Sequence, residues 1–232
     1  MAVLTRERWA HDTRTRAVFF DFDGTLWDPE KLIFQAHAEI FAEAGTSLDH
    51  DLWTRAVGRI GADIWGQLGA LAGGPVDRSA LDRRLERRLD QLLVTIRARP
   101  GVPRVLAEVD ALGLPRGIVS NSSRAWVERY SRQCGVADGW RTIRCADADP
   151  RIAKPEPALY LAALHDLRVP AEAAIAFEDT PSGVHAAKAA GIRCVAVPNP
   201  VTAALDLSAA DLRLESFEQL RLAQVLETLV RP

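Results

Sequence analysis

The sequence predicts an α/β fold in which a doubly wound, Rossmann-like parallel sheet carries an inserted helical cap domain. Over most of the 232 residues, short apolar segments alternate with amphipathic helical patterns. This alternation is typical of a parallel sheet covered by helices on both faces. One long stretch, residues 28–99, interrupts it because that stretch has helical periodicity and almost no strand pattern. A composition that is 48% hydrophobic is sufficient for a large core.

Short segments with the apolar character of buried strands recur along the chain, and helical patterns lie between them. The predicted strands are residues 17–22, 115–120, 141–145, 173–177, 193–197 and, at a sheet edge, 211–214. The predicted helices of this part of the chain are residues 102–112, 123–134, 156–166, 181–190 and 216–229. We therefore expect residues 1–27 and 100–232 to form the α/β core together.

The helical segment between these two parts is expected to form a cap domain of residues 28–99. Apolar side chains recur there at helical spacing, first from Leu32 and again from Leu81, with a Gly-Gly-Pro break between them. The two hinges of this insertion are predicted near residues 27–29 and 97–101. A small helical cap on a doubly wound core is therefore the predicted organisation.

The charge and the cysteine content argue against several classes of partner. A net charge of -2 and a pI of about 6.2 give no electrostatic case for binding nucleic acid or an anionic membrane. No apolar run is long enough to span a bilayer, and the polar N-terminal segment is unlike a signal peptide. The cysteines lack CxxC spacing, which fits a reducing compartment. We expect a cytoplasmic protein, monomeric or weakly homodimeric, whose partner is a small molecule.

Chemically active side chains follow a predicted strand or precede a predicted helix in four motifs. They are Asp21 and Asp23, Ser120 and Asn121, Lys154, and Glu178 with Asp179. The carboxyl ends of parallel strands meet at one edge of a sheet, and ligands bind there near the topological switch point. Strands that deliver carboxylates, a hydroxyl, an amide and a lysine to this edge predict a functional site.

Each motif alone also has a purely structural interpretation. Asp23-Gly24 is a common turn signal, and a single lysine such as Lys154 is usually a surface residue. Thr180 and Pro181 could simply begin a helix, with Thr180 as its N-cap. The functional interpretation is favoured only because all four motifs are expected at the same edge of the sheet.

Taken together, the four motifs resemble those of the haloacid dehalogenase superfamily of aspartate-nucleophile phosphotransferases. The matching residues are Asp21-Phe22-Asp23-Gly24-Thr25-Leu26, Ser120-Asn121, Lys154-Pro155 and Glu178-Asp179. Residues 119–122 and 183–191, with the position of the cap, are similar to the subfamily that contains β-phosphoglucomutase and small sugar-phosphate phosphatases. The resemblance extends over residues 17–220. It implies a Mg²⁺-dependent phosphatase that acts on a small phosphorylated metabolite such as a sugar phosphate.

This resemblance also implies a role for each residue of the motifs. Asp21 is expected to attack phosphorus as the nucleophile and to form a phospho-aspartyl intermediate, with Asp23 as the acid and base. Lys154 is expected to offset the negative charge of Asp21 and of the phosphate. The residues expected to contact the phosphoryl oxygens are Thr25, Ser120 and Asn121. The expected Mg²⁺ ligands are Asp21, the backbone carbonyl of Asp23, Asp179 and Glu178, the last directly or through water.

Two sequence features help to choose among the reactions of this superfamily. A halide leaving group needs no proton whereas an alkoxide does, so Asp23 favours phosphoryl transfer over dehalogenation. β-Phosphoglucomutases carry a cap histidine at the position of Ile33, and His37 is one helical turn further along. The sequence therefore favours hydrolysis, with a β-phosphoglucomutase-type phosphotransferase as the alternative. A non-catalytic metabolite-binding or regulatory protein on the same fold is a second alternative.

The cap is expected to select the substrate. Its substrate-facing loop is predicted at residues 58–62, where Arg59 could contact a second anionic or hydroxyl-rich part of the substrate, with Asp63 and Trp65 nearby. The alternative is a surface arginine in a glycine-flanked turn, with Trp65 in cap packing. Trp27, next to the first hinge, could line the site or pack between the core and the cap.

Overall fold

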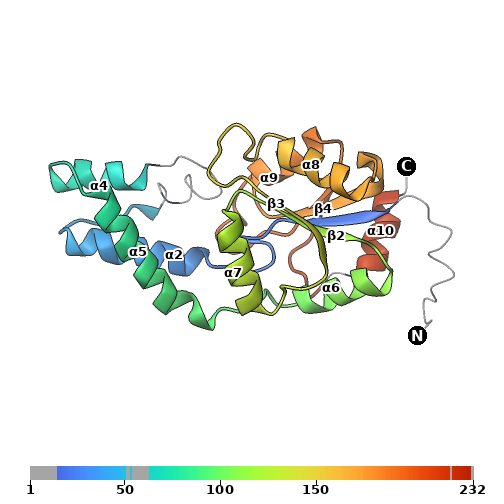
Figure 1. Ribbon diagram of the computed structural model, residues 1–232, viewed down its shortest axis with the longest axis horizontal. Helices are drawn as coiled ribbons and strands as arrows, with labels where there is room; N and C mark the ends of the chain where they lie inside the picture. Colours follow the sequence, from blue (N-terminus) through green and yellow to red (C-terminus); the bar gives the residue numbers. More distant parts are fainter. Residues whose placement is uncertain (1–14, 51–52, 54–62, 220, 231–232) are drawn as a thin grey trace.

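The described part of the chain is built around a six-stranded parallel sheet, as the sequence predicts (Figure 1). The computed structural model describes residues 15–50, 53, 63–219 and 221–230. The strands are β1 (Ala17–Phe20), β2 (Arg116–Ser120), β3 (Trp140–Cys145), β4 (Ala174–Glu178), β5 (Arg193–Ala196) and β6 (Leu212–Arg213). They lie in the order β3-β2-β1-β4-β5-β6, and each adjacent pair is parallel. The sheet therefore extends from β1 in both directions, and the topological switch point lies at β1.

Helices cover both faces of the sheet because alternate side chains of a strand point to opposite faces. In β1, Val18 and Phe20 join one apolar cluster, whereas Ala17 and Phe19 join another. The first cluster also contains residues of α6 (Val102–Ala111), α7 (Arg124–Cys134) and α10 (Leu222–Val230). The second contains residues of α8 (Ala158–Leu167) and α9 (Pro181–Ala189). The buried sheet is thus the middle layer of three.

The last helix begins later than the sequence predicts. The expected helix of residues 216–229 starts at Leu222 instead. The amide of Leu222 donates to the Glu108 carboxylate of α6 at 2.9 Å, while Phe217 is buried in the first apolar cluster. A tertiary contact therefore sets this helix start. Within the described residues, none of the helices combines the length and apolar character that crossing a membrane requires.

The described helices between β1 and α6 gather at one end of the molecule (Figure 1). They are α2 (Glu30–Glu43), α4 (Ile64–Ala72) and α5 (Arg78–Leu92), and the short 3-10 helix η1 (Leu93–Thr95) follows them. These helices have an apolar cluster of their own, which includes Phe41, Trp65 and Leu68. An ion pair also joins α5 to α2, because Arg88 Nη2 lies 2.8 Å from a carboxylate oxygen of Glu39.

The two chain connections between these helices and the sheet run side by side. The amide of Arg99 donates to the carbonyl of Leu26 at 2.8 Å, and Trp27 forms an antiparallel bridge with Ala98. The first connection is also the loop that follows β1. The chain therefore enters and leaves the helical segment directly beside the carboxyl end of the central strand.

Candidate active site

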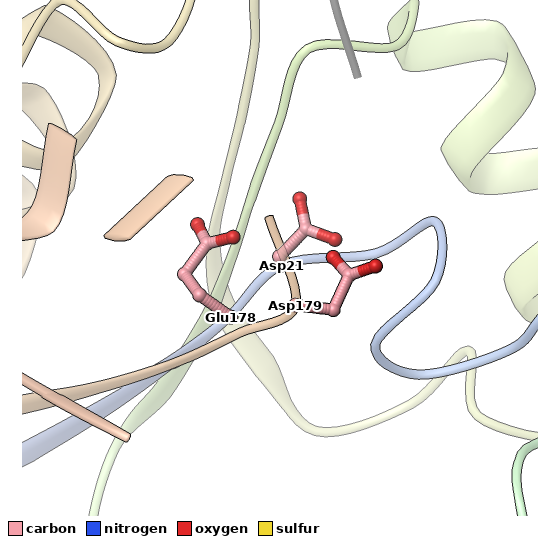
Figure 2. Close-up of side chains that lie close together, drawn as sticks. All are labelled: Asp21, Glu178 and Asp179. Atoms are coloured by element: carbon pink, nitrogen blue, oxygen red, sulfur yellow. The ribbon is translucent and has the colours of Figure 1, made fainter. Parts of the chain in front are cut away.

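Three carboxylates lie together at the carboxyl ends of β1 and β4 (Figure 2). Asp21 follows β1, Glu178 is the last residue of β4, and Asp179 comes next. One oxygen atom from each side chain lies within 4.8 Å of the others, and all three residues are buried. The fully buried strands β1 and β4 are adjacent, so their ends bring residues far apart in sequence into one cluster.

The chemistry of this cluster fits a hard divalent cation. Asp21 Oδ2 and Glu178 Oε2 are buried without a hydrogen-bond partner, and leaving such atoms unsatisfied is costly. Burial raises the pKa of Glu178 to about 7 and raises that of Asp179 well above its usual range, and the neighbouring carboxylates add to both shifts. Carboxylate oxygens are the ligands that Mg²⁺ and Ca²⁺ prefer. A cation at this position would satisfy the unpaired oxygens and the excess negative charge.

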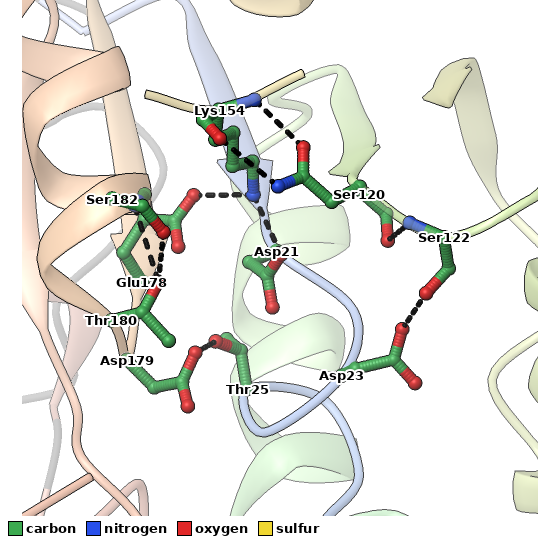
Figure 3. Close-up of polar contacts among 12 residues, drawn as sticks. Asp21, Asp23, Thr25, Ser120, Ser122, Lys154, Glu178, Asp179, Thr180 and Ser182 are labelled. Atoms are coloured by element: carbon green, nitrogen blue, oxygen red, sulfur yellow. Dashed lines mark hydrogen bonds and ion pairs between the residues drawn. The ribbon is translucent and has the colours of Figure 1, made fainter. Parts of the chain in front are cut away.

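Lys154 bridges two of the carboxylates (Figure 3). Its fully buried ammonium donates to Asp21 Oδ1 and to Glu178 Oε1, each at 2.6 Å. Burial alone lowers the pKa of Lys154, but the attraction of Asp21 and Glu178 outweighs burial and the net shift is upward. The hydroxyl of Tyr160, from α8, donates to the same Glu178 oxygen at 2.5 Å. Lys154 is therefore held charged between the first strand and the fourth.

The Asn121 side chain contacts the backbone of Lys154, and its expected phosphoryl contact stays a prediction. Its Oδ1 atom accepts from the Lys154 amide at 2.7 Å, and its Nδ2 atom donates to the Lys154 carbonyl at 3.2 Å. The Asn121 side chain thereby fixes the backbone of the buried lysine. Ser120, the last residue of β2, is buried, and its hydroxyl accepts from the Ser122 amide at 3.0 Å.

Asp179 is held by neutral donors from two loops. Thr25 Oγ1 lies 3.3 Å from Asp179 Oδ1, and Asn199 Nδ2 lies 2.9 Å from Asp179 Oδ2. The Thr202 hydroxyl also approaches Asp179 Oδ2, at 3.4 Å. Thr25 is fully buried and its hydroxyl lies against Asp179, while its expected phosphoryl contact stays a prediction. Sequence reasoning missed Asn199 and Thr202, although their position after the strand of residues 193–197 at the same sheet edge is a signal for them.

Glycines allow the chain to pack closely against these carboxylates. Gly24 has a φ of 87°, and a Cβ at this position would lie 2.2 Å from Asp179 Oδ2. A Cβ at Gly183, in the first turn of α9, would lie 1.8 Å from Glu178 Oε2. Thr180 caps this helix by accepting from the Gly183 amide, which confirms the predicted N-cap. Both glycines are therefore required by contact with the carboxylate cluster.

Asp23 accepts hydrogen bonds on both of its carboxylate oxygens. Trp27 and Trp126 donate their indole N–H groups to Oδ1 at 3.0 and 2.8 Å, and the Ser122 hydroxyl donates to Oδ2 at 2.6 Å. Burial raises the pKa of Asp23 to about 6, while the three donors act in the opposite direction. Trp27 is fully buried and stacks on Tyr130, so it both packs between elements and contacts Asp23. Neither Ser122 nor Trp126 could be identified from the sequence as a partner of this carboxylate.

A cleft lies between α5 and α7. Its volume is about 350 Å³, and its lining includes Leu85 and Leu89 of α5 and Trp126 of α7. Trp126 thus lines the cleft and also donates its indole N–H to Asp23. Arg129 of α7 and Asp90 of α5 form an ion pair of 2.6 Å beside the cleft.

The structure resolves some of the alternatives for the cap residues. Trp65 is buried in the cap and donates to Asp82 at 2.7 Å, which confirms cap packing. Asp63 caps α4 and pairs with Arg78 at 2.7 Å. His37 is buried, and its ring lies against Trp65. Arg59 lies outside the described residues, together with the rest of the loop of residues 58–62, and its substrate contact stays a prediction.

The fold and the site define a class of protein: a Rossmann-like α/β enzyme with a carboxylate cluster at the switch point and a helical insertion after β1. The chain belongs to the haloacid dehalogenase-like hydrolases, whose family model matches residues 15–191. It is 36% identical over 215 residues to the Bacillus subtilis protein YhcW, covering 92% of this chain and 97% of that protein. It is 29% identical to hexitol phosphatase B of Escherichia coli, covering 90% of this chain and 96% of that protein.

A solved structure has the same fold as this chain. A mutant CbbY from Rhodobacter sphaeroides, in complex with xylulose-(1,5)bisphosphate, superimposes with a TM-score of 0.75 at 29% identity. The match covers 90% of this chain and 98% of that chain. Family and relatives together place the chain among the phosphoric monoester hydrolases.

Proposed function

We propose that this protein is a Mg²⁺-dependent phosphatase that hydrolyses a small sugar phosphate or similar metabolite through a phospho-aspartyl intermediate on Asp21. The observation that carries the proposal is the buried cluster of Asp21, Glu178 and Asp179. Lys154 donates to Asp21 and to Glu178, and each of these two carboxylates has a second oxygen without a hydrogen-bond partner. A cytoplasmic location and a monomer or weak homodimer are part of the proposal.

The nucleophile is the Asp21 carboxylate, which Lys154 orients through a contact of 2.6 Å. One of its oxygens attacks phosphorus as the bond between phosphorus and the ester oxygen breaks, which gives an acyl-phosphate. Water then attacks this intermediate, releasing inorganic phosphate and regenerating the carboxylate. Asp21, Glu178, Asp179 and the backbone carbonyl of Asp23 would hold Mg²⁺. The chemistry that the ion supplies when bound is neutralisation of the charge on the phosphoryl oxygens.

Asp23 transfers the protons of the two steps. In the first step it protonates the leaving oxygen, and in the second it accepts a proton from the attacking water. An indole N–H can only donate, whereas a hydroxyl can donate or accept. Of these three partners of Asp23, only Ser122 can accept a hydrogen bond from the neutral acid, so its proton is expected on Oδ2.

The sugar-phosphate assignment rests on the relatives and on the helical segment. Hexitol phosphatase B is named for its substrate class, and the CbbY structure contains a sugar bisphosphate. We assign residues 28–99 as the cap that meets the leaving group, with Arg59 as a candidate contact. Ile33 stands where β-phosphoglucomutases carry a histidine, which supports water as the acceptor of the phosphoryl group.

A phosphatase screen tests the proposal directly. The full chain is incubated with p-nitrophenyl phosphate and a panel of sugar phosphates, with Mg²⁺ and after removal of the ion by EDTA. We expect turnover that falls by about a hundredfold or more with EDTA, because several kcal/mol of charge stabilisation is lost, and that returns when Mg²⁺ is added in excess. Tight binding of a panel member without any turnover would instead support the non-catalytic alternative.

Trp126→Phe tests how Asp23 is held. The substitution removes one of two donors to Asp23 Oδ1 and keeps an aromatic ring beside the cleft. We expect kcat for alkyl phosphates to fall about tenfold, a part of the 10²- to 10⁴-fold that acid–base catalysis contributes, with a smaller loss for p-nitrophenyl phosphate. Trp140→Phe is the matched control, because the Trp140 indole donates to the Val136 carbonyl. Equal losses for both substrates contradict a role in proton transfer.

A further inference from the structure

Arg99 joins two loops of the site through their backbone carbonyls. It lies in the connection from the cap segment back to the sheet, and its side chain is partly buried. Nη1 donates to the Val197 carbonyl at 2.9 Å, and Nη2 donates to the Pro198 carbonyl at 2.7 Å. Nη1 also donates to the carbonyl of Gly24. One guanidinium therefore ties the loop after β1 to the loop after β5.

These are the two loops that hold Asp179. Thr25, next to Gly24, donates to one oxygen of Asp179, and Asn199, next to Pro198, donates to the other. The loops leave no room for a side chain at residue 24, since a Cβ at Gly24 would lie 2.2 Å from Asp179 Oδ2 and 2.8 Å from Asn199 Nδ2. A shift of either loop would therefore move a donor away from the Asp179 carboxylate.

Asn199 is itself held in a fixed orientation. Its side-chain oxygen accepts from the amides of Val201 and Thr202 at 2.8 and 3.0 Å, which leaves the Nδ2 group directed at Asp179. Asn199 and Thr202 are both buried. The donors to Asp179 thus depend on the position of the loop backbone, and Arg99 holds that backbone one and two residues before Asn199.

Arg99 is also part of the hinge. Its amide donates to the Leu26 carbonyl at 2.8 Å, which pairs the outgoing and incoming connections of the cap segment. The guanidinium lies 5.5 Å from the centre of the Phe217 ring. Planar guanidinium groups present several donors in a rigid fork, whereas an ammonium is a compact point charge that cannot reach separate carbonyls in the same way.

We infer that Arg99 is a positioning residue for the cation site: it fixes the loops after β1 and β5 so that Thr25 and Asn199 hold Asp179 in a metal-binding orientation. It acts through the backbone carbonyls of these loops and not as a ligand of the ion. The inference rests on the proposed function, because it requires that Asp179 bind Mg²⁺. It also links the end of the cap segment to the cation site through a single side chain.

Mg²⁺ binding to the full chain without substrate, measured by isothermal titration calorimetry, tests this role. We expect Arg99→Met to weaken the Mg²⁺ Kd by about tenfold or more, the effect usual for residues that orient metal ligands. Arg99→Lys is expected to bind Mg²⁺ several-fold more weakly than the wild type, since lysine keeps the charge but not the forked set of donors of the guanidinium. Arg97→Met is the matched control and should bind as the wild type does. Arg97 is exposed and donates to the Val94 and Ile96 carbonyls of its own connection.

A double variant separates this path from a general loss of stability. Asn199→Ala alone should also weaken Mg²⁺ binding, and Arg99→Met combined with Asn199→Ala should bind no more weakly than the weaker single variant. Losses of binding free energy add for substitutions at independent residues but not for substitutions at residues of one network. Circular dichroism checks each fold, and Arg99→Lys serves as the test if Arg99→Met does not fold.

The outcomes are distinguishable. An unchanged Mg²⁺ Kd in folded Arg99→Met, or in Arg99→Lys where that variant is the test, overturns the inference while leaving the proposed function intact. Additive losses in the double variant also overturn it, because Arg99 would then not act through Asn199. Absence of Mg²⁺ binding and turnover in the wild type would instead overturn the proposed function itself.

Discussion

Asp21→Asn is expected to abolish phosphatase activity, with a loss on the order of 10⁴-fold or more in kcat, as is usual when a covalent nucleophile is removed. An amide has nearly the shape of the carboxylate but is a far weaker nucleophile. The substitution also removes the negative charge of the carboxylate, whose Oδ1 atom accepts from Lys154 Nζ at 2.6 Å. The side chain is almost the same size, so the fold should be retained.

The loss of activity in Asp21→Asn should be accompanied by loss of the phospho-aspartyl intermediate. Rapid quenching of the wild type with labelled substrate should trap a phosphoprotein that hydroxylamine cleaves, and Asp21→Asn should give none. Asp206→Asn is the control for the chemistry of the substitution, because Asp206 is exposed and its Oδ1 atom accepts from the Ser208 amide. Activity that survives in Asp21→Asn at the level of this control would show that the nucleophile is assigned wrongly.

The second large effect is expected from Asp23→Asn and depends on the leaving group. We expect alkyl phosphates to lose about 10²- to 10⁴-fold in kcat, the usual contribution of general acid–base catalysis. p-Nitrophenolate leaves without a proton, so its phosphate should lose much less in the first step. Steady-state rates with a series of leaving groups of different basicity measure the difference. A loss that is independent of the leaving group would contradict the acid role of Asp23.

The pH profile provides a second measurement on the same residue. The pKa of Asp23 is raised to about 6 because the carboxyl group is buried. The leaving oxygen needs the protonated form, and this form decreases as the pH rises through the pKa. For alkyl phosphates, kcat/KM of the wild type should therefore decline above about pH 6, and Asp23→Asn should remove this decline. The test fails if the same decline persists in the variant.

The sequence by itself determined the sheet and the residues that its strands deliver. The four buried residues of β1 lead directly into Asp21, and β4 leads into Glu178 and Asp179. Short apolar segments identify such strands locally, and parallel strands bring their carboxyl ends to one edge regardless of the length of the intervening chain. The closeness of Asp21, Glu178 and Asp179 could therefore be predicted without coordinates.

Only the tertiary structure decided which side chains hold these carboxylates and the loops around them. Trp126 contacts Asp23 across 103 positions of the sequence, and Arg99 contacts the Pro198 carbonyl across 99. The sequence around such loop residues has no hydrophobic periodicity, and the partners of these residues depend on backbone positions that the packing of several elements sets. Thr25 and Asn121 show the same limit, because nothing local in the sequence indicates their contacts with Asp179 and with the Lys154 backbone. The strands themselves follow from local pattern, whereas hydrogen-bond partners are selected by geometry that exists only after the chain has folded.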